Sequence, residues 1–371
     1  MIKFIKKLII KIFLLIYKHH FIRAHLSLAY KMKKNISIDK NIITKEVIKS
    51  YKNKWGKLDS KPNSIYFQLY SSLRGEIDIN YVPDDLYRYK IEKILNNAIY
   101  HSFFENKNLY ELRLPDYKDL FPEAIFRKIN GIFYDKEYHF IYNINSFINS
   151  ISDNEIVVKK ALETGGGLDV YLFKKCLQSG NYYRDDGMDL IQFLNFSKDI
   201  IIQKKVCQCQ FMNNINPSSI NTIRVVTYKS VDNNKVYIMQ MLIKKGKFGS
   251  FVDNRTSGGS FIEVKKDGKI NNYSIDKYGI KYPFYMNDYN LPLYDKIKSL
   301  AIDIAEKDFI NRQLSYDLFI DDNMNIRIME INYSISPAIQ GVCGPAFGRF
   351  TDEVIEYCNK ESGSFVFDIP Y

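Results

Sequence analysis

Hydrophobic spacing divides this sequence into two main regions. Up to about residue 115, apolar residues recur at helical spacing, over residues 43–54 and again over residues 86–104. Further on, short β-rich runs alternate with helical stretches, the longest of them over residues 292–307. The pattern predicts an α+β fold that follows a mainly helical region. The predicted divisions are an N-terminal helix, a helical accessory domain, an α+β domain and a C-terminal tail (residues 1–30, 31–115, 116–360 and 361–371).

Aromatic residues are concentrated in the predicted helical region. Trp55 is followed by a tyrosine-rich segment that runs through Tyr81 and Tyr87. We favour core packing for these rings, because large aromatic side chains dominate buried contacts. A surface on which sugar rings stack is the alternative.

The most informative polar residues lie in the run of residues 316–334. Two β-rich runs flank a segment of turn-forming residues, which predicts a hairpin. If its loop has four residues, Asp317 lies opposite Glu330. Strand alternation then places Ile328, Glu330 and Asn332 on one face.

Two opposed carboxylates on this hairpin indicate a metal site. They would repel each other unless a divalent cation binds both. Mg²⁺ prefers one or two carboxylates together with an amide oxygen, so Asp317, Glu330 and Asn332 are candidate ligands. A surface hairpin with solvated acids is the alternative.

Residues upstream of the hairpin offer positive charge and flexible backbone for phosphate groups. The predicted strand of residues 156–160 carries Lys159, and Gly165, Gly166 and Gly167 follow. Glycines let backbone amides approach phosphate oxygens, and the lysine adds a positive charge. The spacing matches neither a Walker loop nor a Rossmann loop, so a plain hairpin turn remains open.

Two arginines further on are candidate anion-binding residues. Arg224 lies on a predicted strand over residues 222–227, and a guanidinium beside apolar neighbours needs an anion. That anion is either a substrate phosphate or carboxylate, or an acid of the protein itself. Asn254 and Arg255 lie in a polar, glycine-bearing loop that interrupts the β pattern, and such loops often hold substrate groups.

Composition adds little about function. The 371 residues carry a formal net charge of +11, which fits phosphate-rich ligands, anionic glycans, lipid head groups or nucleic acid without choosing among them. Nucleic-acid binding would rest on this charge alone and is not expected. The five cysteines form no CxxC pair and the five histidines show no zinc spacing, so no structural zinc site is expected. An odd number of cysteines without a disulfide framework favours the cytoplasm.

Residues 1–18 combine apolar and basic positions. At about 100° per residue, the lysines fall on one side of a helix and the large apolar residues on the other. The interspersed lysines and the lack of a small-residue cleavage site disfavour a membrane span and a secretory signal. A basic amphipathic helix either lies on an anionic membrane surface or docks on the protein, and both remain open.

Taken in chain order, these residues resemble the ATP-grasp superfamily. They are most similar to the sugar-transfer-associated ATP-grasp proteins found with bacterial capsule and surface-polysaccharide genes. The motifs span about residues 120–350, and the segment before them, including Lys107, is also similar. They comprise a lysine strand with its glycine loop, a hinge-like strand, an arginine strand, a polar loop and the acidic hairpin (Lys159, Gly165–Gly167, Ile201–Gln203, Ser219–Thr227, Val252–Asn254, Gly258–Gly259, Asp317, Glu330–Asn332).

The resemblance implies an ATP-grasp fold, in which two α+β lobes clamp ATP. By family position, three sets of residues would bind ATP phosphates, adenine and Mg²⁺ (Lys159 with Gly165, Gly166 and Gly167; Gln203, Lys204, Lys205 and Val206; Asp317, Glu330 and Asn332). Arg224, with Asn254 or Arg255, would steady the transferred phosphoryl group. Lys160 and Gln203 depart from the family pattern, which bears on nucleotide affinity.

The resemblance also implies the chemistry. ATP phosphorylates a carboxylate, and an amine then attacks the acyl-phosphate to give an amide, ADP and phosphate. The leading hypothesis is a cytoplasmic carboxylate–amine ligase that uses ATP and Mg²⁺ and joins an amino acid or similar amine to a sugar acid of a surface polysaccharide or its precursor. It would be peripheral at the membrane if residues 1–18 bind an anionic membrane surface. The alternatives are a sugar or polyol phosphotransferase and a catalytically silent scaffold at the membrane.

Overall fold

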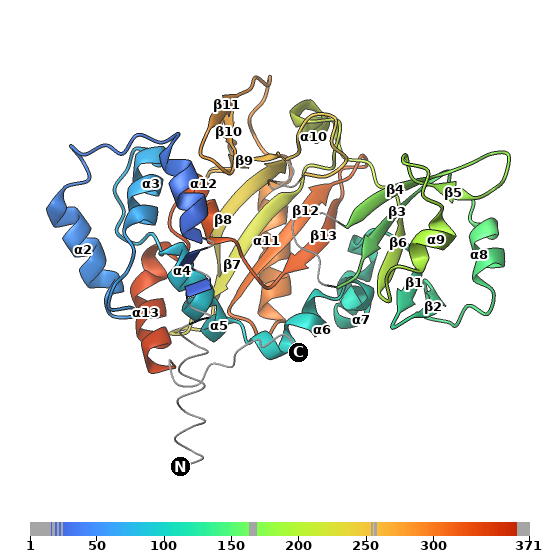
Figure 1. The fold of residues 1–371 in the computed structure, drawn as a ribbon, viewed down its shortest axis with the longest axis horizontal. Coiled ribbons are helices and arrows are strands. Elements are labelled where there is room, and N and C mark those ends of the chain that lie inside the picture. Colours follow the sequence, from blue (N-terminus) through green and yellow to red (C-terminus); the bar gives the residue numbers. More distant parts are fainter. Residues whose placement is uncertain are drawn as a thin grey trace, which may run out of the picture.

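Two antiparallel sheets and a helical region form the part of the chain that the computed structural model describes, which is residues 16, 19–20, 22–23, 25–162, 169–253, 255 and 258–361. The helical region lies at one end of the molecule, the larger sheet in the middle and the smaller sheet at the other end (Figure 1). The strand orders are β2-β1-β6-β3-β4-β5 and β11-β10-β9-β8-β7-β12-β13. The predicted α+β fold is confirmed.

The strands of the smaller sheet are β1 Ala124–Ile129, β2 Ile132–Asp135, β3 Glu155–Lys160, β4 Val170–Lys175, β5 Tyr182–Tyr183 and β6 Ile200–Lys204. Those of the larger sheet are β7 Ile223–Lys229, β8 Val236–Lys245, β9 Ser260–Glu263, β10 Tyr273–Ile275, β11 Lys281–Pro283, β12 Gln313–Ile320 and β13 Ile326–Asn332. The α-helices are α2 Lys45–Trp55, α3 Ile65–Arg74, α4 Asp84–Leu86, α5 Glu92–Leu95, α6 His101–Glu105, α7 Tyr110–Arg113, α8 Ile144–Ser150, α9 Leu190–Leu194, α10 Gln210–Ile215, α11 Tyr294–Glu306, α12 Gln340–Cys343 and α13 Thr351–Lys360. Shorter elements are the π-helical η1 Tyr87–Ile91 and the 3₁₀ turns η2 Ala98–Tyr100, η3 Lys107–Leu109, η4 Pro115–Leu120, η6 Pro337–Ile339 and η7 Gly348–Phe350.

Capping and aromatic burial explain the first long helix, α2. The Thr44 hydroxyl accepts a hydrogen bond from the backbone N–H of Val47 (3.3 Å), which satisfies one amide of the first turn. At the other end Trp55 is fully buried, and its indole N–H donates to the carbonyl of Ile79 (3.0 Å). The helix therefore begins and ends close to the predicted boundaries.

The aromatic residues of the helical region lie largely in its core. Trp55, Tyr81 and Tyr87 are each at most 1% exposed. Rings buried to this extent have no face for a sugar. Core packing is therefore confirmed, and the sugar-stacking alternative is wrong for these three side chains.

The apolar run of residues 86–104 is not one helix, because Asn96 interrupts it after α5. The Asn96 side chain is buried and donates to the carbonyls of Gln313 (2.6 Å) and Tyr333 (2.7 Å). Its oxygen accepts from the backbone N–H groups of Arg312 (3.1 Å) and Gln313 (3.0 Å). Hydrogen bonds of this kind compete with helix continuation, and here they tie the helical region to the larger sheet.

The larger sheet is covered on both faces. One hydrophobic cluster joins the helical region and α13 to one face, while another lies under α11 on the opposite face. Neighbouring residues of β7 alternate between them, with Val226 in the first cluster and Val225 in the second. A third cluster fills the smaller sheet with residues of α8 and α9. Residues 104–121 pack with the α11 cluster, and the predicted domain divisions stay a prediction.

A β-bulge sets the register of the acidic hairpin. Asp317 pairs with Glu330, but the next residue, Leu318, pairs with Ile328, so Met329 is an extra residue in β13. The predicted pairing of the two acids is confirmed, although the loop has five residues rather than four. The prediction that Ile328 and Glu330 share a face is wrong, because the bulge turns Ile328 into the α11 cluster while Glu330 faces the pocket.

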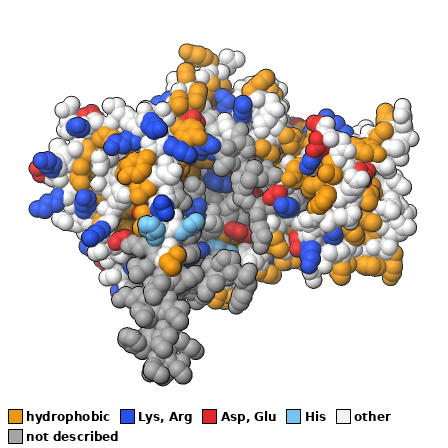
Figure 2. All heavy atoms as spheres, viewed as in Figure 1, with side chains coloured by type: hydrophobic (Ala, Val, Ile, Leu, Met, Phe, Trp, Pro, Cys, Tyr) orange, Lys and Arg blue, Asp and Glu red, His pale blue; other side chains and the backbone are white. Residues whose placement is uncertain are grey.

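The basic segment of residues 1–18 lies outside the described residues except for Ile16, so its contact with a membrane stays a prediction. Within the described part of the chain, no helix combines the length and apolar character needed to cross a bilayer. Lys and Arg side chains are prominent on the helical region in the face shown in Figure 2. That end of the molecule thus carries part of the positive charge.

Replacing Asn96 with alanine should loosen the contact between the helical region and the larger sheet. The change leaves the buried N–H and C=O groups of Gln313 and the carbonyl of Tyr333 without their Asn96 partner, while the N–H of Arg312 keeps its hydrogen bond to the carbonyl of Leu95 (3.1 Å). The free energy of unfolding should therefore fall by about 2–4 kcal/mol. Chemical unfolding measures the loss. Asn97→Ala is the control, because the Asn97 side chain accepts one hydrogen bond, from the N–H of Ile99. Equal losses in the two variants would show that the Asn96 contacts contribute nothing special.

Candidate active site

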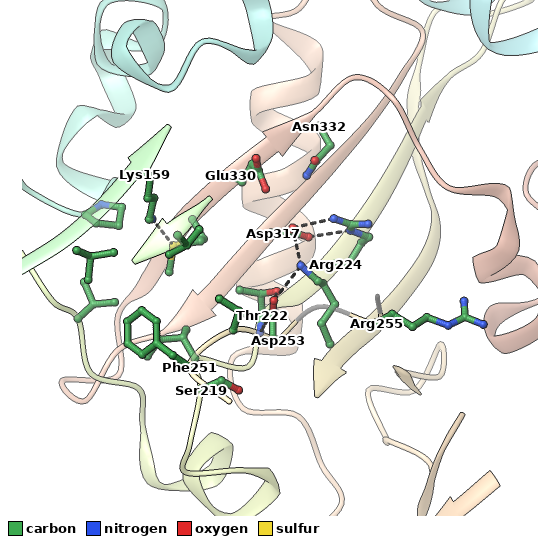
Figure 3. A pocket seen from close by; sticks show the side chains of 18 of the residues that line it. Lys159, Ser219, Thr222, Arg224, Phe251, Asp253, Arg255, Asp317, Glu330 and Asn332 are labelled. Carbon is green, nitrogen blue, oxygen red and sulfur yellow. Dashed lines mark hydrogen bonds and ion pairs between the residues drawn. The ribbon is translucent and has the colours of Figure 1, made fainter. Parts of the chain in front are cut away.

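One large pocket lies between the two sheets and the helical region (Figure 3). Its volume is about 920 Å³. Every predicted site residue that the structure describes lines it: Lys159, Gln203, Lys204, Lys205, Val206, Arg224, Arg255, Asp317, Glu330 and Asn332. The remaining four, Gly165, Gly166, Gly167 and Asn254, lie outside the described residues.

A buried carboxylate with two cationic partners forms the larger-sheet wall of this pocket (Figure 3). Asp317 on β12 is the cross-strand neighbour of Arg224 on β7, whose guanidinium donates to both carboxylate oxygens (2.8 and 2.7 Å). Lys244 on β8 donates to the same carboxylate (3.2 Å) and forms an ion pair with Asp253 (3.1 Å). The anion that Arg224 requires is thus supplied by the protein.

The charges of this network are fixed by their surroundings. Burial would raise the pKa of Asp317, but the positive charges of Arg224 and then Lys244 hold it well below its ordinary value. Burial would lower the pKa of Lys244, but the carboxylates of Asp253 and Asp317 raise it. Both groups are therefore ionised at neutral pH, and the network presents permanent charge to the pocket.

Glu330 and Asn332 are less engaged than Asp317. The Glu330 carboxylate forms an ion pair with Lys107 of the helical region (2.8 Å), and its side chain is 27% exposed. The side-chain nitrogen of Asn332 is buried and has no hydrogen-bond partner among the described residues. Both side chains can therefore take on a further partner.

Mg²⁺ fits the chemistry of these donors. Arg224 and Lys244 donate three hydrogen bonds to the Asp317 carboxylate. About one of its four lone-pair positions therefore remains for a metal ion. Glu330 lies directly across the hairpin, and Asn332 adds an amide, which gives the hard oxygen donors that Mg²⁺ prefers. No three His, Cys, Asp or Glu side chains come together within the described residues, so the candidate set is two carboxylates and one amide.

Lys159 is a buried cation whose only described hydrogen-bond partner is a sulfur. It lies on β3, is 8% exposed, and its ammonium is 3.2 Å from the sulfur of Met329. Burial, followed by the charge of Lys107, lowers the pKa of Lys159 to about 8. A thioether is a weak acceptor, so an anion that enters the pocket would give this ammonium a stronger partner.

The predicted hinge residues lie where β6 leaves the smaller sheet. Gln203 donates to the carbonyl of Pro122 (3.0 Å), and the strand ends at Lys204. Lys204 and Lys205 form ion pairs with glutamates (2.7 and 2.5 Å). Lys205 and Val206 have no regular secondary structure, which brings main chain rather than a sheet edge to the pocket wall.

Arg255 faces different groups from Arg224. Its guanidinium donates to the carbonyl of Asp276 (2.8 Å) and lies 4.9 Å from the ring centre of Phe261. Its side chain points away from Asp317 (Figure 3). A joint role of the two arginines stays a prediction.

Comparison with known families decides the relationship of this chain. The model of the sugar-transfer associated ATP-grasp family matches residues 88–347. This chain belongs to that family. The predicted family and fold are therefore confirmed.

Two solved structures match this ATP-grasp chain at low sequence identity. D-alanyl-alanine synthetase A from Vibrio cholerae shares 15% identity, with coverage of 70% of this chain and 65% of that chain and a TM-score of 0.40. The D-alanine-D-alanine ligase from Coxiella burnetii shares 10% identity, with coverage of 70% and 58% and a TM-score of 0.38. This chain thus spans less than two thirds of the length of either protein. No curated protein matches.

Sequence reasoning did not assign two lysines of the ATP-grasp pocket. Lys244 lies on β8 two residues after the buried Leu242 and therefore on the same face of the strand, and a charged residue on a buried face indicates a buried partner. That signal was present in the sequence. Lys107 reaches Glu330 from the helical region, and no local pattern predicts a contact between residues so far apart in the sequence.

Removing the charge of Asp317 should destabilise the fold far more than removing that of Glu330. Asp317→Asn leaves Arg224 and Lys244 buried beside a neutral amide, so the free energy of unfolding should fall by about 3–5 kcal/mol. Glu330→Gln breaks a partly exposed ion pair and should change it by about 1 kcal/mol or less. Chemical unfolding of both variants measures the difference, and similar losses would contradict the proposed network of fixed charges.

Proposed function

We propose that this chain is an ATP-dependent ligase that acts on the cytoplasmic side of the membrane. It joins an amine, such as an amino acid, to the carboxylate of a sugar acid in the formation of a bacterial surface polysaccharide. One observation carries the proposal: a single pocket brings together the Lys159 ammonium, the positive charges around Asp317 and a set of oxygen donors for Mg²⁺. Membership of the sugar-transfer associated ATP-grasp family supports it.

ATP would bind at the smaller-sheet side of the pocket. Lys159 contacts the phosphates, because its ammonium has no carboxylate partner among the described residues. Gly165, Gly166 and Gly167 cover the phosphates by family position. The adenine lies along the main chain of residues 203–206, where β6 leaves its sheet.

Asp317, Glu330 and Asn332 would hold Mg²⁺ across the hairpin. When bound, the ion neutralises phosphate charge that would otherwise face two carboxylates. Lys107 contributes to this site through its ion pair with Glu330, which offsets the charge of that carboxylate.

The reaction passes through an acyl-phosphate. A carboxylate oxygen of the sugar acid attacks the terminal phosphorus of ATP, and ADP leaves. The amine nitrogen then attacks the acyl carbon, phosphate leaves and the amine releases a proton. This sequence needs no nucleophile from the protein.

Arg224 and Lys244 would stabilise the negative charge that develops in both steps. Arg224 uses two of its five N–H groups on Asp317, which leaves donors for the substrate. Because Asp317 and Asp253 hold these cations in place, little reorganisation is needed when charge develops. Asn254 and Arg255 would bind the substrate rather than the phosphoryl group, since Arg255 points away from Asp317.

Product analysis tests the type of reaction. The full chain is incubated with ATP, Mg²⁺, glucuronic acid and a mixture of amino acids. We expect ADP and an amide in equal amounts. A phosphorylated sugar as the stable product would instead identify a phosphotransferase, and no nucleotide binding at all would favour the scaffold.

ATP binding should require Mg²⁺ and the Glu330 carboxylate. Changes to residues that only orient the ligands of a metal already weaken metal binding about 10–100-fold, so Glu330→Gln should reduce Mg²⁺-dependent ATP affinity by about tenfold or more. Calorimetry with and without Mg²⁺ measures this. Glu356→Gln on the exposed face of α13 is the matched control and should bind as the unchanged protein does. Equal binding by the two variants would remove Glu330 from the metal site.

Affinity for ATP should fall as the pH rises above about 8. The pKa of Lys159 lies at about 8 in the free protein, so the ammonium loses its proton above that pH. Phosphate binds the charged form and raises this pKa, so affinity should fall by up to about tenfold per pH unit above 8 and stay level below it. Lys159→Arg should flatten the profile, because a guanidinium keeps its charge. An unchanged slope in that variant would assign the pH dependence to another group.

A further inference from the structure

The pocket extends beyond the groups that the proposed ATP site uses. Opposite the smaller sheet, its wall is formed by Leu28 and Arg88 of the helical region, by Arg255 and Phe261, and by Ser336 after β13. Leu28 and Arg88 belong to the helical region, which lies at the other end of the molecule from the smaller sheet (Figure 1). The pocket therefore has room for a second ligand beside the nucleotide.

Arg255 is held in a fixed position on this side. Its guanidinium lies over Phe261 at 4.9 Å and donates to the carbonyl of Asp276 (2.8 Å). Its Nε is buried and has no hydrogen-bond partner among the described residues. Within the described part of the chain, no carboxylate forms an ion pair with Arg255. Burying a guanidinium in this way costs free energy unless an anion pairs with it.

The two carboxylates whose charge acts on Arg255 do not supply that anion. Asp276 accepts hydrogen bonds from the backbone N–H groups of Tyr278 (2.8 Å) and Ile280 (2.9 Å), so its carboxylate stabilises the turn that follows it in the chain. Asp84 is bound by the hydroxyl of Tyr70 (2.7 Å), and burial raises its pKa to about 7. Asp84 therefore carries only part of a negative charge at neutral pH.

Two more cations strengthen the preference for an anion on this side. Arg88 also lines the pocket, and its charge and that of Arg255 both act on Asp84. Arg88 is itself paired with Glu92 (2.8 and 3.0 Å), which fixes its position. Lys277 is a third basic lining residue. The side of the helical region thus favours an anion, and Arg255 has no carboxylate ion-pair partner among the described residues.

We propose that the carboxylate substrate carries a second anionic group, which binds Arg255 while the reacting carboxylate lies near Arg224. The proposal rests on the ligase function proposed above and narrows its substrate to a dianionic sugar acid. The second group is a phosphate or a second carboxylate, because a guanidinium recognises both through paired N–H donors. Phe261 and Leu28 would pack against the sugar between the two charges.

Matched sugars test the proposal on the full chain loaded with ADP and Mg²⁺. Equilibrium affinities are measured for glucuronic acid, which has one anionic group, and for glucuronic acid 1-phosphate and glucaric acid, which have two. A charge-assisted contact should raise the affinity for at least one of the dianionic sugars by about tenfold or more. Which of the two gains affinity tells whether the second group is a phosphate or a carboxylate.

The Arg255→Gln variant removes the protein partner of the second anion and is tested with the same three sugars. This variant should bind all three sugars with about the affinity that the unchanged protein has for glucuronic acid, because the gain from the second anion requires both partners. Arg349→Gln removes an exposed cation elsewhere and should keep the gain. A purely structural role of Arg255 would instead weaken all three sugars equally.

Several results would overturn the proposal. Equal affinity of the unchanged protein for mono- and dianionic sugars would do so without any variant, and so would a gain that survives in Arg255→Gln. If either result is found while ADP binds normally, the inference of a dianionic substrate is wrong and the proposed ligase function is unaffected. Failure to bind ADP would remove the proposed ligase function together with this inference.

Discussion

The buried ion pair between Asp317 and Arg224 is the contact on which the pocket depends. A buried pair stabilises a fold only when its geometry offsets the loss of hydration, and here two parallel hydrogen bonds join cross-strand neighbours. Lys244 extends the contact to a third strand and to Asp253, which in turn accepts a hydrogen bond from the backbone N–H of Thr222 (3.1 Å). The same charges therefore fix three strands and a loop, and set the electrostatic character of the pocket.

The helical region is part of this site rather than an appendage to it. Lys107 pairs with Glu330 on β13, Arg88 lines the pocket, and Asn96 bonds to the main chain beside the acidic hairpin. Any movement of the helical region would change the cation facing Glu330 and the wall around Arg255. Under the proposed function, binding of the nucleotide and the position of the helical region would therefore be coupled through direct contacts.

Sequence patterns predicted the parts of the structure that are governed by local rules. Alternation and turn residues predicted the hairpin and the pairing of Asp317 with Glu330, and motif order predicted the family. The bulge at Met329 was missed, because its extra residue is compatible with the same pairing through a different loop length. The break at Asn96 was missed because its hydrogen bonds reach distant parts of the chain. Periodicity likewise cannot tell which anion pairs with an arginine. The sequence therefore made both Arg224 and Arg255 candidates for anion binding, whereas in the structure Arg224 pairs with Asp317 and Arg255 has no carboxylate ion-pair partner among the described residues.

The difference between paired and unpaired cations suggests how binding and catalysis are divided in this pocket. Arg224 already has an optimal carboxylate partner, so a resting substrate gains little from it, whereas charge that develops during transfer gains from donors already in place. Lys159 and Arg255 lack carboxylate partners among the described residues, so the anions of bound ligands gain most from them. Under the proposed function, ground-state affinity then comes from the two sides of the pocket and transition-state stabilisation from its centre. With such a division, binding of the non-reacting groups positions the reacting ones. The reacting atoms of the bound substrate are then not themselves stabilised; such stabilisation would raise the barrier to reaction.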